Sequence, residues 1–342
     1  MDLRSLQRTS EARQTTISIR RVFSQMAGDM VKRNRNENSE VDLVRRIGRW
    51  AAPTLASSSL VLGIGDDCAI YRPRGSREDL LFTSDLLIED VHFRRSTHHP
   101  EDVGWKCLAR GLSDIAAMGG EPRFCLVSLA VAEWADASWI DGFYRGLLRL
   151  ARREKTALAG GDLARAQKAA CDITVCGAVP RGSALRRDGA RDGNAIYLSG
   201  ALGGSALGLS RGVGRAWKRH ARPEPRVALG RFIREQLRAT AAMDLSDGLS
   251  LDLRRMCEAS GLRAEIGKPP IYPGATPGQA LDGGEDYELL FTVPARVEVP
   301  MEFAGVPLTR IGVMRRGKGV LMDGLPLEAL GWDHFTMPGR KR

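Results

Sequence analysis

The chain lacks several patterns that would each assign it to a class of protein. Its 342 residues include only six cysteines, and no two of them form a Cys-x-x-Cys pair. A disulfide framework and a zinc cluster are therefore both disfavoured, and the cysteines are predicted to be reduced core residues of a cytoplasmic protein. No stretch approaches the ~20 apolar residues needed to span a bilayer, and the first residues lack the apolar segment of a secretory signal.

Basic residues outnumber acidic ones, but no segment concentrates them. The formal net charge is +10, and 43 of the 51 basic residues are arginine. They are spread along the chain without a run of five or six, so we expect no nucleic-acid partner and read most arginines as solvated, with a few phosphate ligands. The 43% hydrophobic and 27% charged residues are typical of an ordinary soluble protein with sizeable cores.

The length predicts about two domains. Residues 1–38 are polar and weakly periodic. This extension is therefore expected to be disordered, or to contain the true start of the protein at Met26 or Met30. Residues 39–179 are predicted to form an N-terminal domain and residues 180–342 a C-terminal domain. Helices are predicted from about Ser39 and over 102–118, 137–154 and 246–259, and strands over 60–64, 80–83, 124–131, 156–159, 172–178, 195–199, 288–293 and 308–313. Because they mix without strict alternation, an α+β class is favoured over a doubly wound sheet.

Two acidic clusters stand among glycines and apolar residues, where solvated carboxylates are not expected. One is Gly63–Ile70, which contains Asp67 and is followed by Thr83-Ser84-Asp85, and the other is Met243–Gly248, which contains Asp244 and Asp247. Carboxylates that leave water together repel each other unless they are paired or bound to metal. Several divalent cations explain both clusters economically, and such cations indicate phosphate chemistry.

Single acidic residues elsewhere leave more than one interpretation open. Asp114 shares the apolar side of the predicted helix over 102–118, where it either satisfies a backbone turn or binds metal. Gly161-Asp162 follows an apolar strand and allows close approach of a ligand, although a tripeptide is a weak signal.

Two glycine-containing turns could present main-chain N–H groups to phosphate. Ser246 and Asp247 precede a helix, where they either cap it or leave its N–H groups to a phosphate. The turn at Gly200–Ser205 is a lesser candidate of the same kind, and it lacks the Gly-Lys-Ser/Thr of a Walker site.

A third acidic segment suggests a pocket for a cationic substrate. Residues 282–292 carry acids including Glu285, and a tyrosine, at the start of an apolar strand. His92 follows Asp85 by seven residues and could reach a substrate phosphate, although most single histidines are merely accommodated.

Taken together, these segments resemble the thiamine-monophosphate kinase family, within the superfamily of aminoimidazole ribonucleotide synthetase and selenophosphate synthetase. The resemblance runs from about Ser39 to Pro338. Its most specific segments are 63–69, 83–93, 112–120, 244–248, 283–289 and 331–335. It implies ATP-dependent phosphorylation of thiamine phosphate to thiamine diphosphate, assisted by several Mg²⁺ ions, by a phosphotransferase with a phosphate acceptor. The resemblance also implies a two-domain fold, with an N-terminal mixed sheet forming a barrel-like interface of a homodimer and a C-terminal α/β sandwich.

Site residues are carried over from the family by motif position only. The implied metal ligands are Asp67, Thr83, Ser84, Asp85, Asp114, Asp162, Asp244 and Asp247. The implied ATP contacts are Gly161, Asp162, Arg187 and Ser246, with Tyr144 a looser alignment, and the implied thiamine-phosphate contacts are His92, Glu285 and Trp332. No catalytic side chain is expected, because a phosphate monoester is mostly dianionic at neutral pH and needs no general base.

Some residues depart from the family pattern and keep two alternatives open. Gly111 replaces an asparagine, Leu163-Ala164 replaces two threonines, and Asp90 stands where the family often has glycine. We expect activity, because the implied metal ligands remain. The alternatives are another ATP-using enzyme of the superfamily and a non-catalytic nucleotide-binding regulator.

Overall fold

The structure, a computed structural model, describes residues 39–55 and 59–335. The predictions for residues 1–38 therefore lie outside the described residues. The chain divides into two compact units, residues 1–54 with 333–342 and residues 55–332. Among the described residues, no helix is long and apolar enough to cross a membrane.

The smaller unit contains helix α2 (Glu40–Ala51) and the 3-10 turn η1 (Ala52–Leu55), which reaches the unit boundary. The Ser39 side chain accepts a hydrogen bond from the main-chain N–H of Asp42 (3.3 Å), which confirms the predicted helix cap. The main-chain N–H of Glu40 lies 3.3 Å from both carboxylate oxygens of Asp333.

The larger unit contains two sheets, and the first has six strands in the order β1-β2-β3-β6-β4-β5. These strands are β1 (Leu60–Leu62), β2 (Ala69–Tyr71), β3 (Glu78–Ile88), β4 (Glu121–Ala132), β5 (Ala157–Ala166) and β6 (Ala170–Pro180). Only β4 and β5 pair in parallel. β1 and β5 are edge strands, so within the described part of the chain this sheet is open and forms no barrel.

The second sheet has eight strands, seven of them in the order β14-β13-β9-β12-β7-β10-β8, while β11 pairs with β12. They are β7 (Ala195–Ser199), β8 (Ala241–Asp244), β9 (Leu262–Ile266), β10 (Leu289–Val293), β11 (Glu302–Phe303), β12 (Val306–Arg316), β13 (Gly319–Met322) and β14 (Leu325–Pro326). β9 and β13 are parallel and the other pairs antiparallel. Both sheets are thus mixed, which confirms the α+β class.

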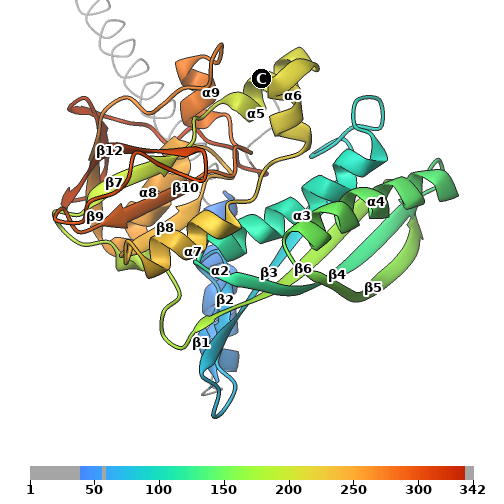
Figure 1. Ribbon diagram of the computed structural model, residues 1–342, viewed down its shortest axis with the longest axis horizontal. Helices are drawn as coiled ribbons and strands as arrows, with labels where there is room; N and C mark the ends of the chain where they lie inside the picture. Colours follow the sequence, from blue (N-terminus) through green and yellow to red (C-terminus); the bar gives the residue numbers. More distant parts are fainter. Residues whose placement is uncertain (1–38, 56–58, 336–342) are drawn as a thin grey trace, which may run out of the picture. The chain divides into compact units, whose positions relative to one another are not determined.

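Helices α3 (Pro100–Ala117) and α4 (Ala137–Arg153) lie side by side over one face of the first sheet (Figure 1). The second half contributes η2 (Arg187–Gly189), α5 (Gly204–Arg211), α6 (Gly214–Ala221), α7 (Val227–Glu235), α8 (Leu249–Ser260) and α9 (Pro277–Asp282). The helices predicted over 102–118 and 137–154 are confirmed, whereas α8 begins three residues later than predicted.

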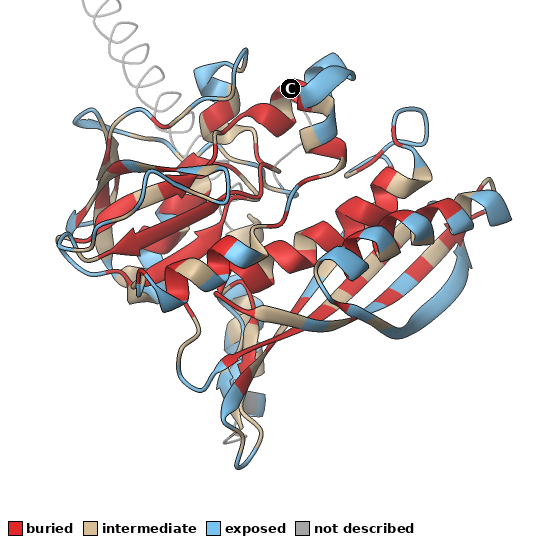
Figure 2. Cartoon of the chain, viewed as in Figure 1, coloured by how far each residue is buried: buried red, intermediate tan, exposed pale blue. Residues whose placement is uncertain are grey.

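Helix α3 is the central element of the larger unit. It packs against β3 and β6 of the first sheet, and also against α7, β8 and β10 of the second half. Nearly all of its residues are buried, whereas β5 is exposed along most of its length (Figure 2). Polar residues on α3 are therefore held inside the protein, where each needs a partner.

All six cysteines are free and buried, as predicted, at positions 68, 107, 125, 171, 176 and 257.

Candidate functional site

Three aspartates from distant parts of the chain converge. Asp67 lies in the loop before β2, Asp114 on the last turns of α3, and Asp244 at the end of β8. Each contributes a carboxylate oxygen, and these oxygens all lie within 4.8 Å of one another. The structure therefore brings together members of both acidic clusters and the helical Asp114.

The electrostatics of this aspartate cluster (Asp67, Asp114 and Asp244) favour a cation. Burial raises the pKa of Asp114 well above its usual range, and the carboxylates of Asp85, Asp244 and Asp67 raise it further. Burial and then Asp67 raise the pKa of Asp244 in the same way. Among the described residues, Oδ2 of Asp67 is buried without a hydrogen-bond partner. Hard oxygen ligands that repel one another and keep an unused acceptor fit Mg²⁺.

Hydroxyl groups hold two of the three carboxylates in place. The Thr83 hydroxyl donates to Oδ2 of Asp114, and the Ser113 hydroxyl donates to Oδ2 of Asp244 (2.6 Å). Both residues are buried, and their hydrogen bonds fix the directions of the two carboxylates.

The residue spacings of β3 and α3 bring two pairs of side chains into contact. Thr83 faces Asp114, and Asp85 faces Arg110, whose Nη2 lies 3.0 Å from Oδ1 of Asp85. Two strand residues span about 6.6 Å and four helix residues about 6 Å, so the two pairs fall in register when the elements run in opposite directions. Ser84 lies between them, and its hydroxyl reaches Asp172 (2.8 Å) on the opposite, exposed face of the sheet.

Arginine contacts the cluster from the second half of the chain. Arg187 of η2 donates through Nη2 to Asp67, and its main-chain N–H donates to Asp66 (3.1 Å). Burial, followed by the charge of Asp67, raises the pKa of Asp66 to about 7. The implied ATP contact Arg187 thus lies directly beside an implied metal ligand.

Two of the main-chain N–H groups before α8, where one alternative was a phosphate site, are already hydrogen-bonded within the protein. The main-chain N–H groups of Asp247 and Gly248 both donate to Oδ2 of Asp252 (3.0 Å each), five and four residues later respectively. Arg255 also pairs with Asp247. Gly248, rather than Ser246 or Asp247, is the capping residue, so that part of the prediction was wrong.

In the lesser candidate for a phosphate site, the turn at Gly200–Ser205, a carboxylate of the protein accepts hydrogen bonds from two of the main-chain N–H groups. Asp286 accepts hydrogen bonds from the main-chain N–H groups of Gly203 (2.6 Å) and Ser205 (3.0 Å) at the start of α5. Burial raises the pKa of Asp286 to about 6 despite these two bonds. These two N–H groups of the lesser candidate turn are therefore already used within the protein.

Asp162 does not lie with the aspartate cluster within one chain. The strand predicted to end before Gly160 continues as β5 to Ala166, and Asp162 pairs with Ser128 in mid-strand. A Cβ on Gly161 would lie 1.8 Å from the Val127 carbonyl oxygen, so the glycine allows close approach of β4 rather than of a ligand.

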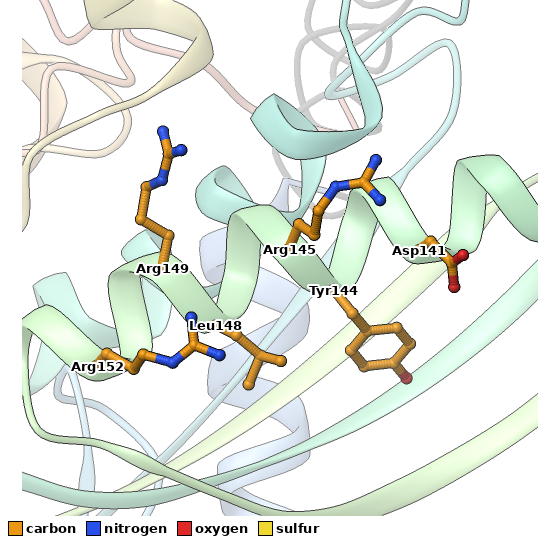
Figure 3. A pocket seen from close by; sticks show the side chains of 6 residues that line it. All are labelled: Asp141, Tyr144, Arg145, Leu148, Arg149 and Arg152. Carbon is orange, nitrogen blue, oxygen red and sulfur yellow. The ribbon is translucent and has the colours of Figure 1, made fainter.

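Tyr144 lies on α4 and packs, partly buried, against the core of the first half. It borders a surface hollow of about 480 Å³ with Asp141, Arg145, Leu148, Arg149 and Arg152. Tyr144 and Leu148 point to one side of the helix, whereas Arg145 and Arg149 point to the other (Figure 3).

Two of the implied thiamine-phosphate contacts meet at a buried lysine. Nζ of Lys106 lies 3.0 Å from Oε1 and 3.1 Å from Oε2 of Glu285, and donates to the carbonyl of His92 (3.2 Å). Burial would raise the pKa of Glu285, but Lys106, His220 and Arg110 lower it to about 2. Glu285 is therefore ionised and already paired. The third contact, Trp332, donates its main-chain N–H to the Asp247 carbonyl (2.9 Å).

The residues that depart from the family pattern have local structural explanations. A Cβ on Gly111 would lie 2.6 Å from Cγ2 of Val175, so the site of the missing asparagine faces the sheet. Asp90 has φ of +66°, which explains why a glycine suits this position, and it pairs with Lys168 (2.9 Å). Leu163 is 61% exposed on edge strand β5.

Known proteins resemble this chain over most of its length. The family model "AIR synthase related protein, N-terminal domain" matches residues 65–179. The thiamine-monophosphate kinase of Bacillus subtilis is 36% identical over 329 residues, covering 86% of this chain and 99% of the relative. The thiamine-monophosphate kinase of Escherichia coli K12 is 36% identical over 307 residues, covering 81% and 93%. The solved structure "AaThiL complexed with AMPPCP and TMP" has a TM-score of 0.77 at 35% identity, covering 87% of this chain and 97% of that chain.

These similarities establish both the fold and the family. The fold is AIR synthase-like, and the chain belongs to the thiamine-monophosphate kinase family.

Proposed function

We propose that this protein transfers the γ-phosphoryl group of ATP to thiamine phosphate and forms thiamine diphosphate. The observation that carries the proposal is the convergence of Asp67, Asp114 and Asp244 in a member of this family. A related structure contains AMPPCP and TMP, which supports ATP and thiamine phosphate as the substrates.

The residues proposed to hold Mg²⁺ are those that supply hard oxygens. The full proposed set is Asp67, Thr83, Ser84, Asp85, Asp114, Asp162, Asp244 and Asp247. When bound, the ions neutralise the facing phosphates and align them for in-line transfer. The chain's own contribution is to fix the carboxylates, through the Thr83 and Ser113 hydroxyls, before substrate arrives.

The organic substrates are assigned to the flanking residues. We propose that Tyr144, Gly161, Asp162, Arg187 and Ser246 contact ATP, and that His92, Glu285 and Trp332 contact thiamine phosphate. Glu285 stays ionised, because Lys106 holds it, and suits a cationic thiazolium, while the Trp332 ring adds an aromatic face. No general base is required, because the acceptor phosphate is mostly dianionic.

A homodimer would explain the position of Asp162. Three interstrand steps separate β5 from β3, a distance of about 14 Å, so Asp162 is far from the strand that carries Thr83. Leu86 on β3 and Leu126 on β4 are both exposed, and their register places them on the same face of the sheet, which supports burial of that face in a barrel-like interface with a second copy. We propose that the second copy brings its Asp162 toward the aspartate cluster. Leu86→Arg with Leu126→Arg should give monomers in sedimentation velocity and lose activity; active monomers would contradict the shared site.

We also propose that residues 39–179 and 180–342 form two domains, which the division of strands between the two sheets supports. A cytoplasmic location is proposed because all six thiols are free and buried.

Turnover and nucleotide binding together test the activity. Purified protein with ATP, Mg²⁺ and thiamine phosphate should release ADP and form thiamine diphosphate, followed by chromatography. Thiamine and other phosphate monoesters serve as acceptor controls. ATP binding without any phosphoryl transfer would refute the kinase and favour a nucleotide-binding regulator, whereas transfer to a different acceptor would favour another enzyme of the superfamily.

A further inference from the structure

One face of α3 carries a row of ionisable side chains that connects the two ends of the site. Lys106, Arg110 and Asp114 follow one another at intervals of four residues, so they lie about 6 Å apart along the helix. Lys106 contacts Glu285 and His92, the proposed thiamine-phosphate residues. Asp114 belongs to the aspartate cluster. Arg110 therefore lies between the substrate residues and the proposed metal ligands.

Lys106 already has acceptors for its charge. Its side chain is 0% exposed, and it pairs with both carboxylate oxygens of Glu285. Its three contacts, two with Glu285 and one with the His92 carbonyl, leave it no free donor. Lys106 is therefore a positioning residue for Glu285 and does not contact the substrate.

Arg110 differs, because two of its donor atoms are not used. Nη2 donates to Asp85 (3.0 Å), but among the described residues Nε and Nη1 are buried without a hydrogen-bond partner. Leaving such donors unpaired is costly, so an oxygen acceptor is needed that the described chain does not supply. The side chain is 14% exposed, and its neighbours Asp85 and Glu285 are 22% and 21% exposed, so solvent reaches this part of the row.

The acceptor is identified by charge and by position. The carboxylates of Asp85 and Glu285 lie near Arg110 and repel an anion. An anionic ligand therefore binds here only if a cation with free donors contacts it. Thiamine phosphate carries a cationic ring and a phosphate, and the phosphate must face the metal ligands for transfer to occur. With the ring at Glu285 and the metal ligands at Asp114, the phosphate falls at the level of Arg110. A guanidinium fork suits phosphate oxygens, which it binds in a bidentate manner.

We propose that Arg110 binds the phosphate group of the acceptor substrate and so distinguishes thiamine phosphate from thiamine. The proposal rests on the proposed function and adds a residue to it. Its chemistry is recognition only, with no bond made or broken by Arg110.

The test compares two ligands on the full-length protein by calorimetry in the presence of Mg²⁺ and without ATP. The wild type should bind thiamine phosphate more tightly than thiamine, and Arg110→Met should reduce that preference by about 10- to 100-fold while affinity for thiamine changes little. Arg110→Lys should recover part of the preference. Arg254→Met, which removes an exposed arginine paired with Glu258 on α8, is the matched control and should behave like the wild type. If Arg110→Met does not fold, as judged by circular dichroism, Arg110→Gln provides the same comparison.

Each outcome decides the proposal. A preference retained in the folded variants, or equal affinity of the wild type for both ligands, would overturn it. A loss of affinity for AMPPCP with an unchanged preference for thiamine phosphate would also overturn it, because Arg110 would then bind the nucleotide. Wild-type turnover is measured in parallel, so that failure of the kinase assignment is distinguished from failure of the Arg110 assignment.

Discussion

Replacing Lys106 with methionine tests whether the buried lysine exists to hold Glu285. Methionine fills much of the aliphatic volume of lysine but removes the charge. In the wild type both carboxylate oxygens of Glu285 lie within hydrogen-bonding distance of Nζ, at 3.0 and 3.1 Å. After the substitution, Glu285 keeps only weaker cationic neighbours, His220 at 3.3 Å and Arg110.

The expected loss of stability follows from this geometry. Removing one partner of a buried ion pair costs about 3–5 kcal/mol, because the other charge is left uncompensated. Glu285 is 21% exposed and retains two cationic neighbours, so we expect a value near the lower limit, about 3 kcal/mol. In Lys106→Met with Glu285→Gln no charge is left unpaired, so the double variant should recover to within about 1 kcal/mol of the wild type.

Urea denaturation of the four proteins in this cycle measures the coupling, with Arg254→Met as an exposed control that should change stability by less than about 1 kcal/mol. The pKa of Glu285 is lowered from 4.5 to about 2, so in the wild type its contribution to stability is fully present above about 4.5 and is lost progressively as the pH falls from there to about 2. Wild-type stability from this pair should thus be constant between pH 7 and pH 5. A cost no larger than the control, or a double variant as unstable as the sum of the single variants, would refute the reasoning.

Two further substitutions test the aspartate cluster and the helix that supports it. Asp114→Asn should abolish turnover yet raise the unfolding free energy of the metal-free protein by about 1–3 kcal/mol, because one of several repelling carboxylates is removed. Thermal unfolding should show that Mg²⁺ stabilises the wild type but not the variant. Equal stabilisation of both proteins by Mg²⁺ would contradict the metal role. Gly111→Ala should destabilise the protein by about 1 kcal/mol, although alanine favours helices, because its Cβ would lie 2.6 Å from Cγ2 of Val175. In a Val175→Ala background the same substitution should be neutral or stabilising. A gain in stability in the wild-type background would refute the packing argument.

The aspartate cluster was predictable because its residues conflict with their surroundings in the sequence. Asp67, Asp114 and Asp244 each stand among glycines or apolar residues, where a carboxylate is not expected without a partner. The helices over 102–118 and 137–154 were predictable for a similar reason, since their apolar spacing is regular and long. The convergence of the three carboxylates within 4.8 Å depended on three separate elements, and only the family resemblance anticipated it.

The two candidate phosphate sites show that local sequence reasoning misses acceptors supplied by other parts of the chain. The turn before α5 has the glycines of an anion site, but its N–H groups bind Asp286, more than 80 residues later. The N–H groups before α8 bind Asp252, which is close enough in sequence to have been noticed as a competing acceptor. A main-chain N–H group is available to phosphate only if no carboxylate of the protein reaches it first.

Lys106 and Arg110 escaped prediction because their burial is a tertiary property of α3. An amphipathic helix on the surface of a sheet would leave these side chains in water, and that is how most arginines in the chain were interpreted. Here the second half of the chain packs on the opposite side of the helix, through α7, β8 and β10, and encloses its polar edge. The close approach of α4 requires Gly104, where a Cβ would lie 1.9 Å from the Phe143 carbonyl oxygen. One rigid helix thus fixes the spacing between Glu285 and the aspartate cluster. That spacing is about 12 Å over eight residues, and Arg110 stands at its midpoint, which is the geometry on which its proposed role in binding the acceptor phosphate depends.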